Sequence, residues 1–114
     1  MNNPQFWQAI DQLIATSEII IDRPKGSKHP DKDLIYPLNY GYLDKTRSSD
    51  GEDIDVWLGD GGGKQCNAII CTVDILKRDS EIKLLLDCTQ EEIDQIMEIY
   101  NRWDSQKGML ILRN

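Results

Sequence analysis

The chain has 114 residues, a length that predicts a single domain over residues 1–114 with a modest hydrophobic core. Its formal net charge of −7 argues against nucleic-acid binding and does not favour an anionic membrane surface, so an anionic ligand would need local lysines, arginines or bound cations to attract it. The three cysteines lack Cys-x-x-Cys spacing and no long apolar run is present, which favours reduced thiols, a cytoplasmic location and no membrane span.

The first predicted element is an amphipathic helix over residues 4–16. Asn3 and Pro4 are typical of an N-cap followed by proline at the first helical position. Behind them, large apolar residues recur at helical spacing: Phe6, Trp7, Ile10, Leu13 and Ile14. We expect this stripe to pack on the body of the protein as ordinary core.

A β-branched run over residues 18–22 predicts a strand, with Arg23 at its end. The segment 24–35 that follows is rich in proline, glycine and charge, which is typical of a loop. It contains the only histidine of the chain, His29, between a lysine and a proline. A lone histidine in a polar loop is usually solvated, so we expect no catalytic role for it.

Residues 36–56, YPLNYGYLDKTRSSDGEDIDV, combine a tyrosine block with an acidic turn. Gly51 allows the backbone to turn sharply within a short acidic segment: Asp50, Glu52, Asp53 and Asp55. Asp55 lies between two apolar residues, as in a strand with one wet face, so it is expected to point toward the same side as Asp50 and Glu52. Carboxylates packed together need a compensating cation, and hard ions such as Mg²⁺ or Ca²⁺ prefer oxygen ligands. The alternative is an acidic surface turn that binds nothing.

Three further strands are predicted over residues 54–58, 66–76 and 81–87. The glycine-rich segment DGGGKQ joins the first two and predicts a hairpin turn, and it lacks the spacing of a phosphate loop. In the third strand, isoleucine and leucine occupy alternate positions. Glu81 and Lys83 are therefore expected to share the opposite face.

A second helix is predicted after Thr89, which opens a capping box with Glu92. An apolar stripe follows at helical spacing as far as Tyr100. Residues 109–113 predict a last strand. This order of elements favours an α+β domain built on a small antiparallel sheet or barrel.

The tyrosine block and the acidic turn together resemble the soluble inorganic pyrophosphatases of the first family. The resemblance is carried by YPxNYGY, then a short spacer with a threonine, then DGxxxDV, without a gap over residues 36–56. In that family the acidic segment usually reads D-G-D-P-x-D-V, so Glu52 replaces an aspartate and Asp53 a proline. With a hydrophobe-Asp-Arg match that ends at Arg23, the resemblance covers roughly residues 19–83, plus a match at Tyr100.

The resemblance implies an OB-like antiparallel β-barrel, flanked by an N-terminal and a C-terminal helix. It also implies Mg²⁺-dependent hydrolysis of inorganic pyrophosphate to two phosphates, with Mn²⁺ as a second cofactor and a homo-oligomer as a further expectation. The implied roles are as follows: metal ligands Asp50, Asp55, Asp79 and Glu81; catalytic carboxylates Glu52 and Asp55; phosphate-binding residues Arg23, Lys83, Tyr40 and Tyr100. The family's phosphate-binding lysine after Tyr100 is Asn101 in this chain.

These substitutions leave three functions open. The leading hypothesis is a pyrophosphatase that is slower than family members with intact motifs. The second is a non-catalytic relative that binds a phosphate, a nucleotide or a divalent metal, which the changes at Glu52 and Asn101 favour. The third is an interaction protein that keeps only the fold. In that case the tyrosines are core aromatics, and Asp79, Glu81 and Lys83 form an ordinary charged turn.

Overall fold

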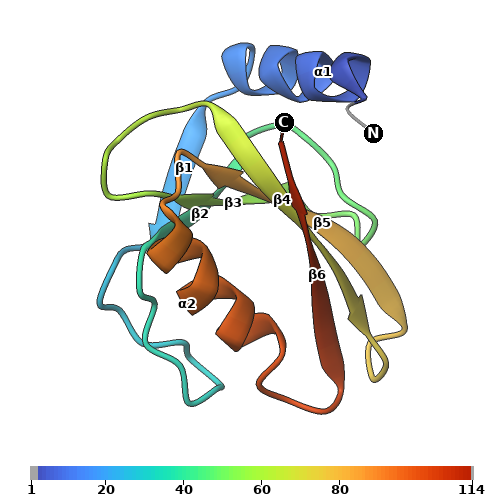
Figure 1. Cartoon of the computed structure of the whole chain (residues 1–114). Coiled ribbons are helices and arrows are strands. Elements are labelled where there is room, and N and C mark those ends of the chain that lie inside the picture. Colours follow the sequence, from blue (N-terminus) through green and yellow to red (C-terminus); the bar gives the residue numbers. More distant parts are fainter. Residues whose placement is uncertain (1–2, 114) are drawn as a thin grey trace.

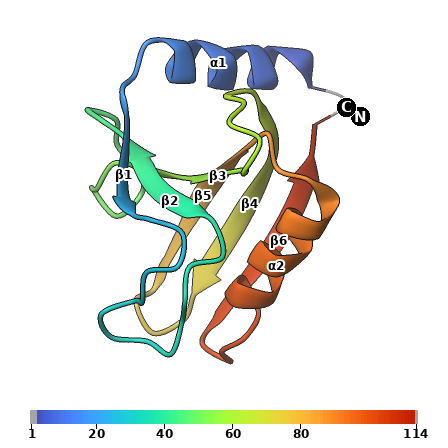
Figure 2. The same ribbon diagram turned by 90° about the vertical axis from the view of Figure 1, so that its left-hand side faces the viewer.

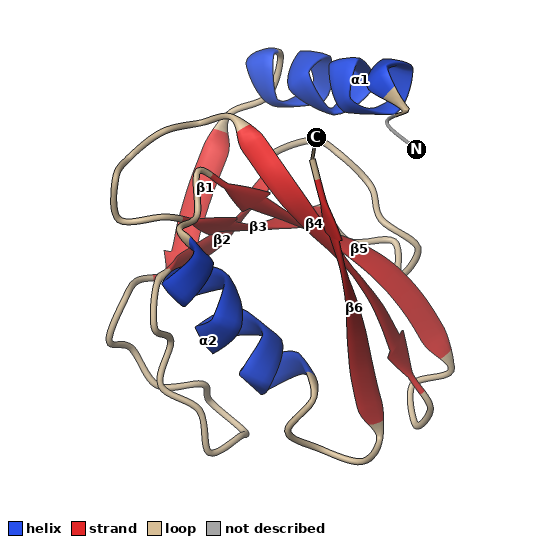
Figure 3. Cartoon of the chain, in the orientation of Figure 1, coloured by secondary structure: helices blue, strands red, loops and turns tan. Residues whose placement is uncertain are grey.

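The computed structural model describes residues 3–113, which form one six-stranded sheet with two helices (Figures 1 and 3). In chain order the elements are α1 (Pro4–Ala15), β1 (Ile19–Arg23), β2 (Asn39–Leu43), β3 (Ile54–Leu58), β4 (Cys66–Asp74), β5 (Asp79–Leu86), α2 (Gln90–Tyr100) and β6 (Gln106–Leu112). The α+β class is confirmed, and each predicted helix and strand is present within a few residues of its expected bounds.

The strand order in the sheet is β1-β2-β3-β5-β4-β6. The neighbours β4 and β5 are antiparallel, as the sequence predicts, but β3 and β5 run parallel, so a purely antiparallel sheet is wrong. Within residues 3–113 no pairing joins β1 to β6, and closure into a barrel is not shown.

The hairpin predicted between β3 and β4 is also wrong, because β5 lies between these two strands. The glycine-rich segment instead carries the chain from one side of β5 to the other. Gly59 donates its N–H to the carbonyl of Leu86 at 2.9 Å. A Cβ atom at Gly59 would lie 2.1 Å from the carbonyl oxygen of Asp87, so only glycine allows this close backbone approach.

Strand β2 was not predicted, although it joins β1 to β3. Its residues belong to the tyrosine block, whose alternation of Tyr40, Gly41 and Tyr42 is that of a strand. A Cβ atom at Gly41 would lie 1.8 Å from the carbonyl oxygen of Ile20. The glycine of this block is therefore required by the packing of β1 on β2.

Alternate strand residues belong to two different cores, so the two helices pack on opposite faces of the sheet. Figure 2 shows α1 across one end of the strands and α2 alongside β6. On the α2 face the core includes Trp57, Ala68, Ile70, Leu85, Ile93, Ile96, Ile99 and Tyr100. On the α1 face it includes Trp7, Ile14, Leu43, Val56, Ile69, Leu84 and Leu86. The expectation that both helical stripes pack on one sheet is confirmed. In residues 3–113, neither helix has the length and apolar composition that a membrane crossing requires.

The two helices begin differently. Thr89 accepts the Glu92 N–H, and the Glu92 carboxylate accepts the Thr89 N–H at 2.8 Å, so the predicted capping box is present. Asn3 precedes Pro4 as expected, but its backbone has φ 50° and its side chain makes no capping hydrogen bond. The start of α2 is thus fixed by side-chain hydrogen bonds, whereas α1 starts with a proline and with backbone hydrogen bonds to the Asn3 carbonyl.

Candidate functional site

Beyond the end of α2, the sheet face that it covers changes from apolar to polar. Strand alternation places Leu85, Lys83, Glu81 and Asp79 on this face one after another. A cavity of about 130 Å³ lies here, with Lys83, Glu81 and Asp79 in its lining. We call this cavity the polar pocket.

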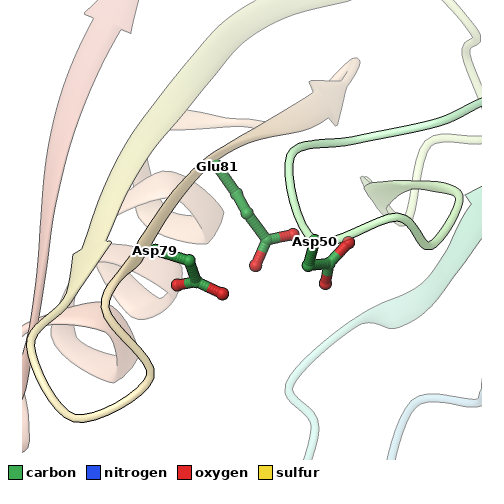
Figure 4. A group of neighbouring side chains, drawn as sticks. All are labelled: Asp50, Asp79 and Glu81. Atoms are coloured by element: carbon green, nitrogen blue, oxygen red, sulfur yellow. The ribbon is translucent and has the colours of Figure 1, made fainter.

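Three carboxylates meet beside the polar pocket. Asp79 and Glu81 come from β5 and Asp50 from the loop before β3, and their ligand oxygens all lie within 4.8 Å of one another (Figure 4). Ser48 Oγ donates to Asp50 Oδ1 at 2.7 Å and lies 3.4 Å from Glu81 Oε1. The Glu52 N–H also donates to Asp50 Oδ1, at 2.9 Å. The structure thus brings together three of the four expected metal ligands.

The charges of this three-acid cluster are only partly compensated. Burial raises the pKa of Glu81, and the neighbouring carboxylates of Asp50, Asp55 and Asp79 raise it further against the opposing effect of Lys83. The hydrogen bond from Ser48 lowers the pKa of Asp50. A hard divalent cation fits this set, because all three donors are carboxylate oxygens and their mutual repulsion would be relieved.

Asp55 makes a different contact from the one that its place in the motif implies. Its Oδ2 lies 2.5 Å from the Nζ of Lys83, whose side chain is only 9% exposed. The same Nζ lies 3.5 Å from Glu81 Oε1. Burial alone would lower the pKa of Lys83, but interactions with Tyr100, Asp55 and Glu81 outweigh it and raise the pKa. Lys83 is therefore a buried ammonium beside the three-acid cluster, and Asp55 lies outside the cluster.

The expected tyrosines line the polar pocket. Tyr100 accepts a hydrogen bond from Trp57 Nε1 at 2.9 Å, which fixes its hydroxyl at the end of α2. Tyr40 packs against Trp57, with ring centroids 4.7 Å apart. Burial raises the pKa of Tyr40 and of Tyr100, so both hydroxyls stay protonated and can donate hydrogen bonds.

Of the expected site residues, Asp50 and Asp55 lie beside the pocket without lining it, and Glu52 and Arg23 also lie outside the lining. The side chain of Glu52 is exposed, and only its backbone contacts Asp50. Arg23 lies opposite Tyr40 in the register of β1 and β2, and it interacts with Tyr36. Arg23 is thus on the pocket side of the sheet but lies beyond the lining residues.

Position 101, where the resembled family has a lysine, is structural in this chain. Asn101 Nδ2 donates to the Met97 carbonyl at 2.9 Å, and Asn101 Oδ1 accepts the Gly108 N–H at 3.2 Å. The side chain therefore ends α2 and ties it to β6. It supplies no charge to the pocket.

Several lining residues were not expected from the sequence, among them His29, Lys32, Lys77 and Trp103. His29 is half-buried rather than solvated, and its ring stacks on Tyr36 with centroids 6.2 Å apart. Lys32 lies over the Trp103 ring, 5.0 Å from its centroid. No local spacing indicates these contacts, because they join residues that lie far apart in the chain.

Comparison with solved structures shows that the chain has a pyrophosphatase-like fold. It is similar to an inorganic pyrophosphatase from Neisseria gonorrhoeae, with a TM-score of 0.55 and 20% identity over 80% of this chain and 71% of that chain. An inorganic pyrophosphatase from Helicobacter pylori gives 0.54 and 15% identity over 84% of this chain and 75% of that one. An inorganic phosphatase from Anaplasma phagocytophilum gives 0.53 and 15% over 84% and 74%. A scan of protein-family models and a search of curated proteins found no match to the sequence.

Proposed function

We propose that this chain, as a single cytoplasmic domain, hydrolyses inorganic pyrophosphate to two phosphates with Mg²⁺, or Mn²⁺, as the cofactor. The observation that supports it is the three-acid cluster, which lies directly beside a small pocket with the buried ammonium of Lys83 in its wall. Cation-binding oxygens and a phosphate-binding cation are the two components that phosphoanhydride hydrolysis needs. The pyrophosphatase-like fold adds to this support.

Asp50, Asp79 and Glu81 would hold the metal, which when bound supplies positive charge and makes a bound water more acidic. Lys83 would bind phosphate oxygens through its ammonium, and the hydroxyls of Tyr40 and Tyr100 would donate further hydrogen bonds. Each of these groups stabilises the negative charge that builds up on the phosphate during bond cleavage.

Asp55 takes part through Lys83. The ammonium of Lys83 is bonded to Asp55 at 2.5 Å, so turning it toward a phosphate oxygen releases that carboxylate. The freed Asp55 would then accept a proton from the attacking water. Glu52 is proposed to assist this water and Arg23 to bind a phosphate oxygen, as the resemblance implies. Both would have to turn toward the pocket to do so.

A non-catalytic role in binding a small phosphate, a nucleotide or a divalent metal is the second candidate. Lys83 already interacts with both Asp55 and Glu81, and this reduces the negative charge that a cation would meet. The Glu52 side chain is exposed and Asp55 is bonded to Lys83, so the attacking water has no free carboxylate in place. A domain built in this way could hold a ligand without cleaving it.

The test is phosphate release from pyrophosphate with Mg²⁺, measured for the wild type and for Asp79→Asn and Glu81→Gln. We expect release by the wild type and a loss on the order of a hundredfold in each variant, because each removes a metal ligand. Asp53→Asn is the control, since Asp53 lies in the acidic turn with Asp50 but outside the cluster. No release above a metal-only blank, or equal losses in all variants, would contradict catalysis.

Metal binding is tested separately by thermal unfolding in millimolar Mg²⁺. A ligand that binds the native state raises its stability by mass action, so the melting temperature of the wild type should rise. The rise should be much smaller in Glu81→Gln. If Mg²⁺ stabilises the wild type but no phosphate is released, the binding role becomes the better account.

A further inference from the structure

The 24–35 loop is held against the polar pocket by hydrogen bonds at several points. The Tyr36 N–H donates to the Ser27 carbonyl at 2.9 Å, and Arg102 Nη1 donates to the Asp33 carbonyl at 2.9 Å. Leu34 is buried in the α2-face core. The loop is therefore an ordered wall of the pocket, and its side chains have defined positions.

His29 is fixed in one tautomer by its own loop. Its Nδ1 accepts the N–H groups of Asp31 at 3.0 Å and Lys32 at 3.1 Å, so the proton of the neutral ring must be on Nε2. Burial, together with the nearby cations Lys32, Arg23 and Lys28, lowers the pKa of His29 against the opposing effect of Asp31. The ring is thus a neutral donor of one Nε2–H in the pocket lining.

Two lysines that follow this histidine in the sequence, Lys32 and Lys77, also line the pocket. Lys32 is half-buried, and its ammonium lies 5.0 Å from the centroid of the Trp103 ring, which holds it in place. Lys77 belongs to the turn between β4 and β5, where its N–H donates to the buried Asp74 at 3.0 Å. Both lysines are free of ion pairs to acids within residues 3–113.

We propose that His29, Lys32 and Lys77 form a second phosphoryl-binding subsite of the polar pocket. This inference rests on the proposed function. Lys83 would bind one phosphoryl group of the diphosphate, and the subsite would bind the other. The pocket lining contains three lysines, Lys32, Lys77 and Lys83, against three acids, Asp74, Asp79 and Glu81. Two of these acids, Asp79 and Glu81, belong to the three-acid cluster and would face a metal, whereas Asp74 accepts the Lys77 N–H. The lysines therefore remain for phosphate, and the two lysines of the subsite offset the missing cation at Asn101.

The size of the pocket sets the class of substrate. A volume of about 130 Å³ suits a diphosphate, whereas sites for larger organic ligands usually enclose about 300 Å³ or more. On the side of the 24–35 loop, the pocket wall includes Lys32 and Trp103, which are in contact. The subsite therefore selects an inorganic diphosphate and excludes a nucleotide with its base and sugar.

The test measures binding of imidodiphosphate, a hydrolysis-resistant diphosphate, to the full chain with Mg²⁺ by calorimetry. We expect Lys32→Ala to weaken binding about tenfold, since it removes a charged hydrogen-bond donor. The matched control is Lys28→Ala, the same change in the same loop at an exposed side chain outside the lining. It should change the affinity less than twofold, and Lys32→Arg should restore most of what Lys32→Ala loses.

A second variant tests the histidine without removing its turn. In His29→Asn the side-chain oxygen can still accept the backbone N–H groups of Asp31 and Lys32, but the Nε2–H donor is lost. We expect imidodiphosphate to bind several-fold more weakly. Circular dichroism should show that each variant remains folded.

Equal affinities of Lys32→Ala, Lys28→Ala and the wild type would overturn the subsite, as would the absence of imidodiphosphate binding to the wild type. Binding of ADP as tightly as imidodiphosphate would overturn the proposed selectivity. Phosphate release is measured independently. If the wild type releases no phosphate but Lys32→Ala binds imidodiphosphate more weakly than the wild type does, the result would support the subsite and contradict catalysis.

Discussion

The two faces of the sheet differ in how completely they are covered. On the α2 face, apolar packing extends from Leu34 to Tyr100, and the polar pocket begins where this core ends. On the α1 face, the helix covers one end of the strands and leaves apolar side chains exposed at the other, among them Val73, Ile82 and Met109. The face with the complete core is the one that carries the candidate site.

This difference shows what the candidate site requires. The ammonium of Lys83 and the hydroxyls of Tyr40 and Tyr100 need fixed positions, and the packed aromatic rings around Trp57 provide them. Among residues 3–113, no buried charged side chain lies on the α1 face, so looser packing costs it little. We therefore expect substitutions on the α2 face to have larger effects than matched substitutions on the α1 face.

The largest effect is expected for Lys83→Met. Methionine keeps most of the volume of Lys83 but leaves Asp55 without its partner at the edge of the core. Removing one member of a buried pair costs about 3 to 5 kcal/mol, and the partial exposure of Asp55 favours the lower end, about 3 kcal/mol. Urea unfolding measures this change. Lys77→Met, at an exposed lysine, is the control and should stay within about 0.5 kcal/mol.

The next largest effect is expected when the same isoleucine-to-alanine substitution is made in each helix and the losses of stability are compared. Ile96 of α2 is fully buried, whereas Ile10 of α1 is half-buried. The same substitution to alanine should cost about 3 kcal/mol at Ile96 and about 1 kcal/mol at Ile10, because the cost grows with the cavity that is left. Equal losses in urea unfolding, at unchanged slope, would show that α1 is packed as tightly as α2.

Much of this architecture could be predicted from the sequence, because its signals are local. The capping box at Thr89 and the alternation around Lys83 depend on neighbouring residues, and both are confirmed. The parallel pairing of β3 with β5 could not be predicted, because it joins strands separated by β4. Strand β2 was not predicted, because its tyrosines were interpreted as part of a family motif and not as the alternation of a strand.

The candidate site was predictable only in part, for a similar reason. Alternation along a strand assigns Asp55 and Lys83 to a face, but it does not say that their side chains bond to each other. The contribution of His29 and Lys32 depends on how the 24–35 loop folds against Trp103. Such contacts arise from tertiary packing, and no spacing in the sequence indicates them.

A third, smaller difference is expected at the starts of the helices. Thr89→Ala removes an N-cap hydrogen bond and half of the capping box, which should cost about 1 kcal/mol. Asn3→Gly should cost nothing, because the Asn3 side chain caps no N–H and its φ of 50° suits glycine. Thermal unfolding of both variants tests this. A loss at Asn3 equal to that at Thr89 would mean that α1 also depends on its first side chain.

The smallest effect concerns the ion pair that ties α1 to the end of β6. Arg113 Nη1 and Nη2 donate to the two carboxylate oxygens of Asp11 at 2.7 and 2.8 Å, and the guanidinium lies over the Trp7 ring. These hydrogen bonds lower the pKa of Asp11 from its usual value of 3.8, against a small opposing effect of burial. The pair is close to solvent, so Asp11→Asn should lower the melting temperature near neutral pH by less than Thr89→Ala does.

The loss caused by Asp11→Asn should also depend on pH in a defined direction. Because the pKa of Asp11 is lower in the folded chain, the unfolded chain takes up the proton first as the pH falls. The stabilisation is therefore present above the usual value of 3.8 and disappears as the pH falls through the folded pKa. Melting temperatures of wild type and Asp11→Asn should therefore converge as the pH falls below 3.8 and through the lower folded pKa. A difference that persists in acid would mean that Asp11 holds α1 through contacts other than this ion pair.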